Sequence, residues 1–342
     1  MQGVNSEFEE QGYALFRGLL SPEEVRHYRG EIQQLSAVSD ADFGKKVFTC
    51  ADGITQNEAF WPLIYHSRLL EAVRSLIGPS IRYTQHSDLH AHVSGRAASA
   101  DFVGGWHRDS ACREFNSGPD WDESSAPYQI IRVAIYLQTY AESGSSLGVV
   151  PGSHRYEERL NVNALRLWKR LLGGQYRLKR ALWRAGLGEE PAYYHPWFYH
   201  RVKPARWPLL APPEAPVWIR TEPGDCIVFN QRLYHSASPV KGPKYAMYLS
   251  YSPENEHARN HVRYYRFLRK DLSYRPIPEA LAATLRAHDI YMQEPEPEEI
   301  QEATVEWGKR DHLADLKLAN GDGAHGEAQP AQRREPPLTQ RI

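Results

Sequence analysis

The nine residues 130–138, Ile-Ile-Arg-Val-Ala-Ile-Tyr-Leu-Gln, indicate the class of fold. Every second side chain is apolar, and a period of two is typical of a β-strand with two distinct faces. We expect one face to carry Ile131, Val133, Ile135 and Leu137. We expect the other face to carry Arg132, Ala134, Tyr136 and Gln138. A polar group among small and aromatic side chains on that second face suggests that it lines an interior site.

Other short stretches on both sides of this strand also predict strands, and glycine or proline turns separate many of them. The Pro223-Gly224-Asp225 turn, for example, leads directly into an apolar run. The expected strands cover residues 13–16, 81–93, 106–109, 147–150, 226–229 and 245–251.

Helices are expected mainly before and after these strands. Ser21 supplies an N-cap, Pro22 the first helical position, and Glu23 and Glu24 the acidic first turn of a helix that should end near Leu35. Further helices are expected over residues 59–76, ended by Gly78, and over residues 278–292.

Many short strands with flanking helices favour a mainly β fold of the sandwich or barrel type. The strand rhythm stops over residues 155–206, where residues 163–184 look helical, so this stretch is expected to be a partly helical insertion. Residues 320–342 are rich in Gly, Pro, Gln and Arg and predict a disordered tail. We therefore expect a single domain over residues 1–319.

The triplet His107-Arg108-Asp109 and the distant His235 carry the strongest chemical signal. In a strand, His107 and Asp109 share one face and Arg108 points the other way. One further histidine completes a set of two histidines and one carboxylate, which is typical of non-haem Fe(II) oxygenases. The alternative is a polar pair at a strand end and an unrelated histidine.

Four segments in the right order resemble the phytanoyl-CoA dioxygenase family of Fe(II)/2-oxoglutarate oxygenases. They are residues 8–24 with Gly12-Tyr13 and Ser21-Pro22-Glu23-Glu24, residues 106–109, residues 144–154 ending Val-Pro-Gly-Ser-His, and residues 223–239 around His235. The resemblance covers about residues 5–255. It implies a double-stranded β-helix, a jelly-roll barrel, with helices outside. It also implies that His107, Asp109 and His235 hold Fe(II), and that 2-oxoglutarate and O2 are the co-substrates. Because related halogenases lack the carboxylate, Asp109 favours a hydroxylase or oxidative cyclase.

The sequence departs from the family at the residue that anchors 2-oxoglutarate. The resemblance places an arginine at the position of Ala246. Lys244 has the same strand parity and is the nearest cation, and Arg132 is the second candidate. A planar arginine fork binds a carboxylate at two points, whereas lysine offers a point charge. The alternative for Lys244 is a solvated turn residue after Lys241.

Composition limits the setting in which the protein works. The net charge of -1 argues against general attraction to nucleic acid. The three cysteines form no paired framework, so a reducing cytoplasm is the simplest location. The N-terminal residues have no signal-peptide pattern, and no apolar run is long enough for a membrane span. We expect a soluble, cytoplasmic protein.

The insertion is the best indicator of substrate class. Residues 155–206 contain twelve Lys or Arg against four Glu, with tryptophans and tyrosines between them. This balance favours an anionic or carbohydrate-containing small molecule, while packed aromatics with solvated basic residues are the plain alternative. We expect a small-molecule hydroxylase or oxidative cyclase. The competing hypothesis is a catalytically silent jelly-roll binding protein.

Overall fold

The computed structural model describes residues 2–92, 108–109, 126–144, 146–155, 177–179, 181–187, 217–238, 240–268, 272–296 and 298. All described residues belong to one compact unit, Met1–Arg310. None of the helices in these ranges is both long and apolar enough to cross a membrane.

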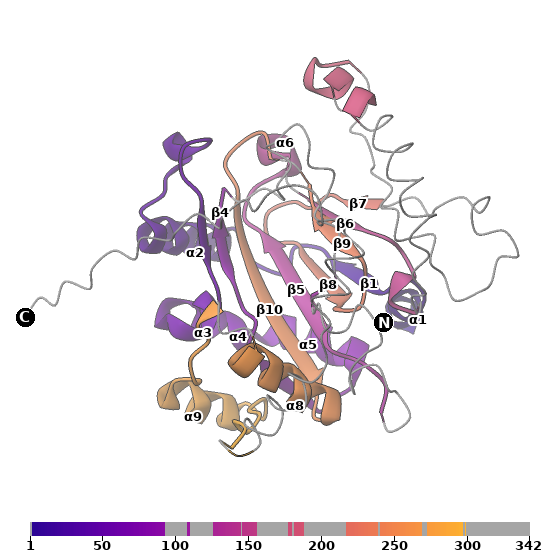
Figure 1. Cartoon of the computed structure of the whole chain (residues 1–342), viewed down its shortest axis with the longest axis vertical. Coiled ribbons are helices and arrows are strands. Elements are labelled where there is room, and N and C mark those ends of the chain that lie inside the picture. The colour runs from indigo at the N-terminus through magenta and orange to yellow at the C-terminus, as the bar shows by residue number, and fades with distance from the viewer. Residues whose placement is uncertain are drawn as a thin grey trace, which may run out of the picture. The chain divides into compact units, whose positions relative to one another are not determined.

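Ten strands are described, and they form two antiparallel sheets (Figure 1). They are β1 (Tyr13–Phe16), β2 (Phe48–Cys50), β3 (Ile81–Thr84), β4 (Leu89–Ala91), β5 (Ile131–Tyr136), β6 (Leu147–Val149), β7 (Val217–Ile219), β8 (Cys226–Asn230), β9 (His235–Ala237) and β10 (Tyr245–Pro253). The larger sheet has the order β1-β8-β5-β10-β4-β2, with β3 also pairing with β10, and the smaller has the order β7-β6-β9.

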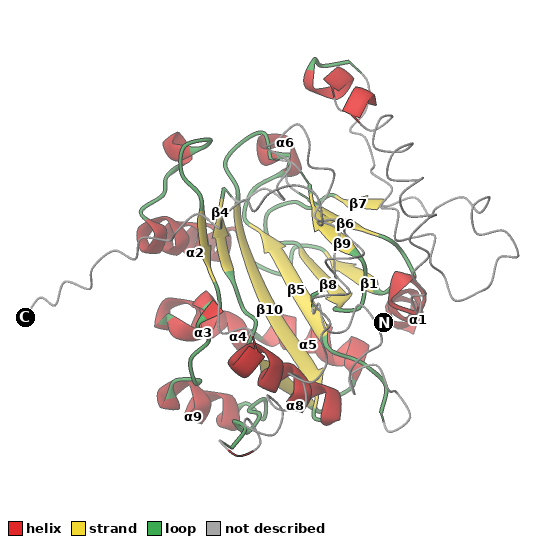
Figure 2. Cartoon of the chain, viewed as in Figure 1, coloured by secondary structure: helices red, strands yellow, loops and turns green. Residues whose placement is uncertain are grey.

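Helices pack beside the larger sheet (Figure 2). The α-helices with their bounds are α1 (Gln2–Gln11), α2 (Pro22–Ser36), α3 (Gly53–Gln56), α4 (Trp61–Ile64), α5 (Ser67–Ile77), α6 (Tyr140–Ser143), α8 (Glu256–Arg263) and α9 (Glu279–Ala287). A π-helix, η7 (Tyr264–Leu268), follows α8, and short 3-10 turns occupy Asp40–Asp42, Glu58–Phe60 and Ser153–Arg155.

The expected start of the first long helix is confirmed in detail. The Ser21 hydroxyl accepts a hydrogen bond from the Glu24 amide at 3.2 Å, and the Glu24 carboxylate accepts one from the Ser21 amide at 2.7 Å. This reciprocal capping box satisfies two amides that the helix itself leaves without partners. The helix begins at Pro22 and ends at Ser36, close to the predicted end.

Three predicted elements are shorter or divided in the structure. The single helix expected over residues 59–76 is split, because the His66 ring accepts the Leu69 amide and starts α5 as a separate helix. The strand expected over residues 81–93 is interrupted between β3 and β4 by the polar residues 85–88. The last helix ends at Ala287, and Asp289 then adopts a left-handed backbone with φ 55°.

The predicted two faces of residues 130–138 are confirmed. Ile131, Val133 and Ile135 belong to the core cluster that includes the helices, while Ala134 and Tyr136 belong to a second cluster. That second cluster also contains side chains of β6, β7, β8 and β10. The two sheets therefore enclose an interior layer, and the polar groups of the same face lie within it.

Of the predicted insertion, the described part comprises Arg155 and residues 177–179 and 181–187. Residues 177–179 and 181–184 are helical, in agreement with the expected helix. The tail predicted from residue 320 lies outside the described residues.

Candidate active site

Asp109 and His235 lie side by side between the two sheets. The Asp109 Oδ1 atom is 3.3 Å from the His235 Nε2 atom, and both side chains are buried. His235 opens β9, whereas Asp109 lies at a bend. The Asp109 amide donates to the Gln231 carbonyl at 3.3 Å, and the Tyr265 hydroxyl donates to the Asp109 carbonyl. One main-chain hydrogen bond thus links two segments more than a hundred residues apart.

The hydrogen bonds of His235 settle which ring nitrogen faces the site. Its Nδ1 atom lies 2.9 Å from the Leu233 carbonyl oxygen, which can only accept, so Nδ1 carries the proton. Nε2 is then the ring nitrogen that faces Asp109 and is placed to bind a metal. A histidine that donates one nitrogen to a carbonyl and offers the other is the usual arrangement of a metal ligand.

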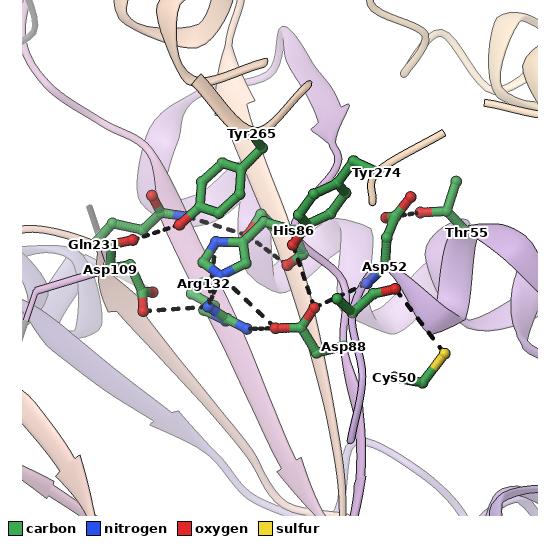
Figure 3. A network of polar contacts seen from close by, with 12 residues as sticks. Cys50, Asp52, Thr55, His86, Asp88, Asp109, Arg132, Gln231, Tyr265 and Tyr274 are labelled. Carbon is green, nitrogen blue, oxygen red and sulfur yellow. Dashed lines mark hydrogen bonds and ion pairs between the residues drawn. The ribbon is translucent and has the colours of Figure 1, made fainter. Parts of the chain in front are cut away.

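Arg132 projects from β5 into the same place (Figure 3). Its Nη1 atom is 3.2 Å from Asp109 Oδ1, and its Nη2 atom is 2.5 Å from Asp88 Oδ2. Nη1 also contacts the His86 ring. This guanidinium is one of the two cations predicted to anchor the co-substrate, but here it is engaged by protein groups.

Asp109 is held in its charged form. Burial opposes ionisation, but the Arg132 guanidinium and His235 outweigh that effect and hold the Asp109 pKa well below its usual range. An ionised carboxylate beside an imidazole nitrogen is a donor pair that a divalent transition metal binds readily. The residues present therefore fit a ferrous ion.

The third predicted ligand, His107, lies outside the described residues. Within the described ranges, no group of three His, Cys, Asp or Glu side chains is arranged to hold a metal. Arg108, which precedes Asp109, points away from it, as expected. The Arg108 guanidinium donates to the Ser153 carbonyl at 2.9 Å and lies 4.6 Å from the Tyr234 ring centroid. The strand expected over residues 106–109 is wrong for Arg108 and Asp109, which belong to no strand.

Lys244 is buried on the interior side of the larger sheet, with 1% of its surface exposed. The solvated turn lysine considered as an alternative is therefore wrong. Its Nζ atom lies 5.5 Å from the Tyr136 ring centroid. Burial lowers the pKa of Lys244 to about 8. Burial also lowers the pKa of His90, and the nearby charge of Lys244 lowers it further. The amine therefore forms a cationic end to this aromatic interior.

Several residues of the site escaped sequence reasoning. Asp88 and His86 lie in the polar interruption between β3 and β4, and the run Gln-His-Ser-Asp at 85–88 is the local signal that could have found them. Tyr265 and Tyr274 come from the chain after β10. Tyr265 stacks on His86 with 4.1 Å between ring centroids, and the Tyr274 hydroxyl lies 3.4 Å from Asp88 Oδ1. No local pattern distinguishes these tyrosines from ordinary core residues.

Known proteins provide an independent comparison. A curated relative, the ectoine dioxygenase of Nocardia farcinica (strain IFM 10152), is 26% identical over 162 residues, which are 44% of this chain and 50% of the relative. The chain thus spans about half the length of the curated relative it matches.

Two solved structures resemble the chain at low identity. One is HygX from Streptomyces hygroscopicus with nickel and 2-oxoglutarate bound, with a TM-score of 0.48, 16% identity, and coverage of 74% of this chain and 87% of that chain. The other is the non-heme alpha ketoglutarate dependent carbocyclase SnoK from nogalamycin biosynthesis, with a TM-score of 0.46, 18% identity, and coverage of 73% and 83%.

The family model described as phytanoyl-CoA dioxygenase (PhyH) matches residues 8–247, which is well over half of the 342 residues. This range includes β1 through the first part of β10, and with them Asp109, Arg132, His235 and Lys244. The chain therefore belongs to the phytanoyl-CoA dioxygenase (PhyH) family.

Proposed function

We propose that this protein is an Fe(II)- and 2-oxoglutarate-dependent dioxygenase that hydroxylates or oxidatively cyclises a small molecule. The observation that carries the proposal is the buried pair Asp109 and His235, with Oδ1 and Nε2 3.3 Å apart and with His235 Nδ1 bonded to the Leu233 carbonyl. Membership of the PhyH family supports it. The competing hypothesis, a silent binding protein, does not require a carboxylate kept ionised beside a histidine nitrogen.

In this proposal His107, Asp109 and His235 hold the iron. Together with 2-oxoglutarate and O2, the metal supplies an oxidant for an unactivated C–H bond, and succinate and CO2 are released. The protein's own part is to keep Asp109 charged, to keep the proton of His235 on Nδ1, and to exclude water. Both side chains are almost fully buried, which suits the last of these tasks.

We propose Lys244 as the anchor of the distal 2-oxoglutarate carboxylate. It precedes Ala246 and Tyr248 at the same strand parity, and both of those residues line the interior cluster. A carboxylate brought to a buried ammonium forms a charge-assisted hydrogen bond that water screens little. Arg132 suits this role less, because Asp109 and Asp88 already lie against its two terminal nitrogens.

The remaining expectations are part of the same proposal. The two facing antiparallel sheets are compatible with a double-stranded β-helix, and we propose that fold for a single domain over residues 1–319. The basic and aromatic composition of residues 155–206 supports an anionic or carbohydrate-containing substrate. The free thiols of Cys50 and Cys226 are compatible with work in the reducing cytoplasm.

An anaerobic titration tests the activity. Fe(II) and 2-oxoglutarate added to the intact protein should develop a weak visible charge-transfer band, which His107→Ala and His235→Ala should abolish. His27→Ala is a matched control, because His27 lies on the exposed face of α2, and it should leave the band unchanged. Absence of the band in the unaltered protein, with no substrate-dependent succinate release, would favour the binding protein.

A further inference from the structure

Arg132 links Asp109 to a second buried carboxylate, that of Asp88. The two terminal nitrogens lie 3.2 Å from Asp109 Oδ1 and 2.5 Å from Asp88 Oδ2, on opposite sides of the guanidinium (Figure 3). The exposed fractions of the three side chains are 7% for Arg132, 4% for Asp109 and 12% for Asp88. At this burial, ion pairs are little screened, so the position of the cation strongly influences where each carboxylate lies.

Asp88 is held by groups that do not depend on Arg132. Its Oδ1 atom accepts the Asp52 amide at 3.0 Å, and the Tyr274 hydroxyl lies 3.4 Å from the same atom. Its carbonyl accepts the Tyr248 amide of β10 at 3.0 Å. Asp88 is therefore tied to the main chain on both sides and can act as a fixed support for the guanidinium.

His86 adds a second support for Arg132. Its backbone has φ 102°, a conformation that favours glycine and is strained for other residues. The ring nevertheless contacts Arg132 Nη1 and stacks on Tyr265, whose hydroxyl bonds to the Asp109 carbonyl. The strained turn thus places a side chain between Arg132 and the segment that holds the Asp109 backbone.

We propose that Arg132 and Asp88 form a positioning pair for Asp109, in which Arg132 directs the Asp109 carboxylate and Asp88 shares the charge of Arg132. This inference rests on the proposed iron site. With Asp88 present, one guanidinium is divided between two carboxylates, and Asp109 keeps enough negative charge to bind a metal. Without it, the whole charge of Arg132 faces Asp109 and competes with the metal ion.

The test measures Co(II) binding to the intact protein without oxygen, followed by the visible d–d absorption of the bound ion. Partners of metal ligands typically contribute about 10- to 100-fold to metal affinity, so Asp88→Asn should weaken Co(II) binding by at least about tenfold. It should also change the shape of the d–d bands, because Asp109 would approach the metal differently. A purely structural role would leave the band shape unaltered.

Arg132→Lys separates the bridging geometry from the charge, because one ammonium cannot reproduce the two-pronged contact of a guanidinium. It should weaken Co(II) binding as well. If Asp88 acts through Arg132, the two losses should not multiply. The double variant should then bind Co(II) about as weakly as the weaker-binding of the two single variants.

Asp225→Asn is the matched control. Asp225 is also a buried aspartate 2.5 Å from an arginine nitrogen, that of Arg17, but it precedes β8 and lies at the opposite end of that strand from Gln231. It should lower the thermal unfolding temperature and leave Co(II) affinity unchanged. No Co(II) binding by the unaltered protein would contradict the iron site itself. Binding by Asp88→Asn within about twofold of the unaltered protein, or an equal loss in Asp225→Asn, would overturn the positioning pair while leaving the iron site intact.

Discussion

Replacement of the buried Lys244 by methionine should make the protein more stable and less able to bind 2-oxoglutarate. Methionine keeps most of the length of the side chain and its contact with the Tyr136 ring, and it removes the charge. The two effects have opposite signs, so they separate a functional lysine from a structural one.

The stability effect follows from the pKa of Lys244, which burial lowers from 10.5 to about 8. At about 1.4 kcal/mol for each pKa unit, the native state disfavours the charged amine by about 3 kcal/mol. This penalty is fully present at pH 7, and it fades as the pH rises from about 8 to 10.5, where the native state loses its proton first. Lys244→Met should therefore raise the free energy of unfolding at pH 7 by up to about 3 kcal/mol.

The binding effect follows from the loss of one charge-assisted hydrogen bond. Such bonds contribute about 1.5–3 kcal/mol, so the loss of one should raise the dissociation constant for 2-oxoglutarate about 10- to 100-fold. Anaerobic calorimetry with Co(II)-loaded protein measures that constant, and thermal unfolding of the metal-free protein measures stability. Lys244→Arg should retain most of the affinity.

Lys241→Met, on the exposed turn three residues earlier, is the matched control and should change neither quantity. Unchanged affinity for 2-oxoglutarate in Lys244→Met, with metal binding intact, would refute the assignment of the anchor. A loss of stability in the same variant would refute the reasoning about burial of the charge.

Three further predictions concern other parts of the same structure. Tyr265→Phe removes the hydroxyl that donates to the Asp109 carbonyl, so calorimetric unfolding should show a loss of about 1–3 kcal/mol, and an unchanged unfolding profile would contradict the contact. Gly224→Ala should lower the free energy of unfolding in a urea titration by about 1–3 kcal/mol, since φ is 93° and the added Cβ would lie 2.4 Å from the Leu20 carbonyl oxygen. An unchanged free energy of unfolding would contradict this conformation of the turn at Gly224. Affinity for 2-oxoglutarate should fall as the pH rises above about 8, because Lys244 then loses its proton. The affinity of Lys244→Arg should stay constant over the same pH range, because arginine keeps its charge.

Local signals were sufficient for elements whose stabilising contacts lie within a few residues. The capping box at Ser21 and Glu24 depends on residues three apart, so the start of α2 at Pro22 could be predicted from the local sequence. The two faces of β5 follow from alternation alone, because side chains of a strand must point to opposite sides. The break at His66 was missed because apolar periodicity continues across it, whereas the His66 ring accepts the Leu69 amide and starts a separate helix. The break at residues 85–88 was missed although these residues are polar, because the alternation on both sides of them predicted one continuous strand.

The candidate site was only partly predictable for the same reason. His107, Asp109 and His235 were chosen by residue type and order along the chain, and Asp109 and His235 lie together in the structure. The surroundings of Asp109 come from Asp88, Arg132 and Tyr265, which are separated by more than forty residues from one another. Nothing in the sequence near Tyr265 indicates that its hydroxyl reaches the Asp109 backbone.

The sequence by itself determined which residue types are available, in what order, and which faces of the strands they occupy, because these properties depend on short-range stereochemistry. Only the tertiary structure decided that Arg132 lies between two carboxylates and that Lys244 is buried, because both depend on antiparallel pairing of β5 with β10 and on β4 beside it. Burial and charge pairing are properties of distant segments brought together. They set the ionisation of Asp109 and the pKa of Lys244, and through these the chemistry that the interior of the protein can support.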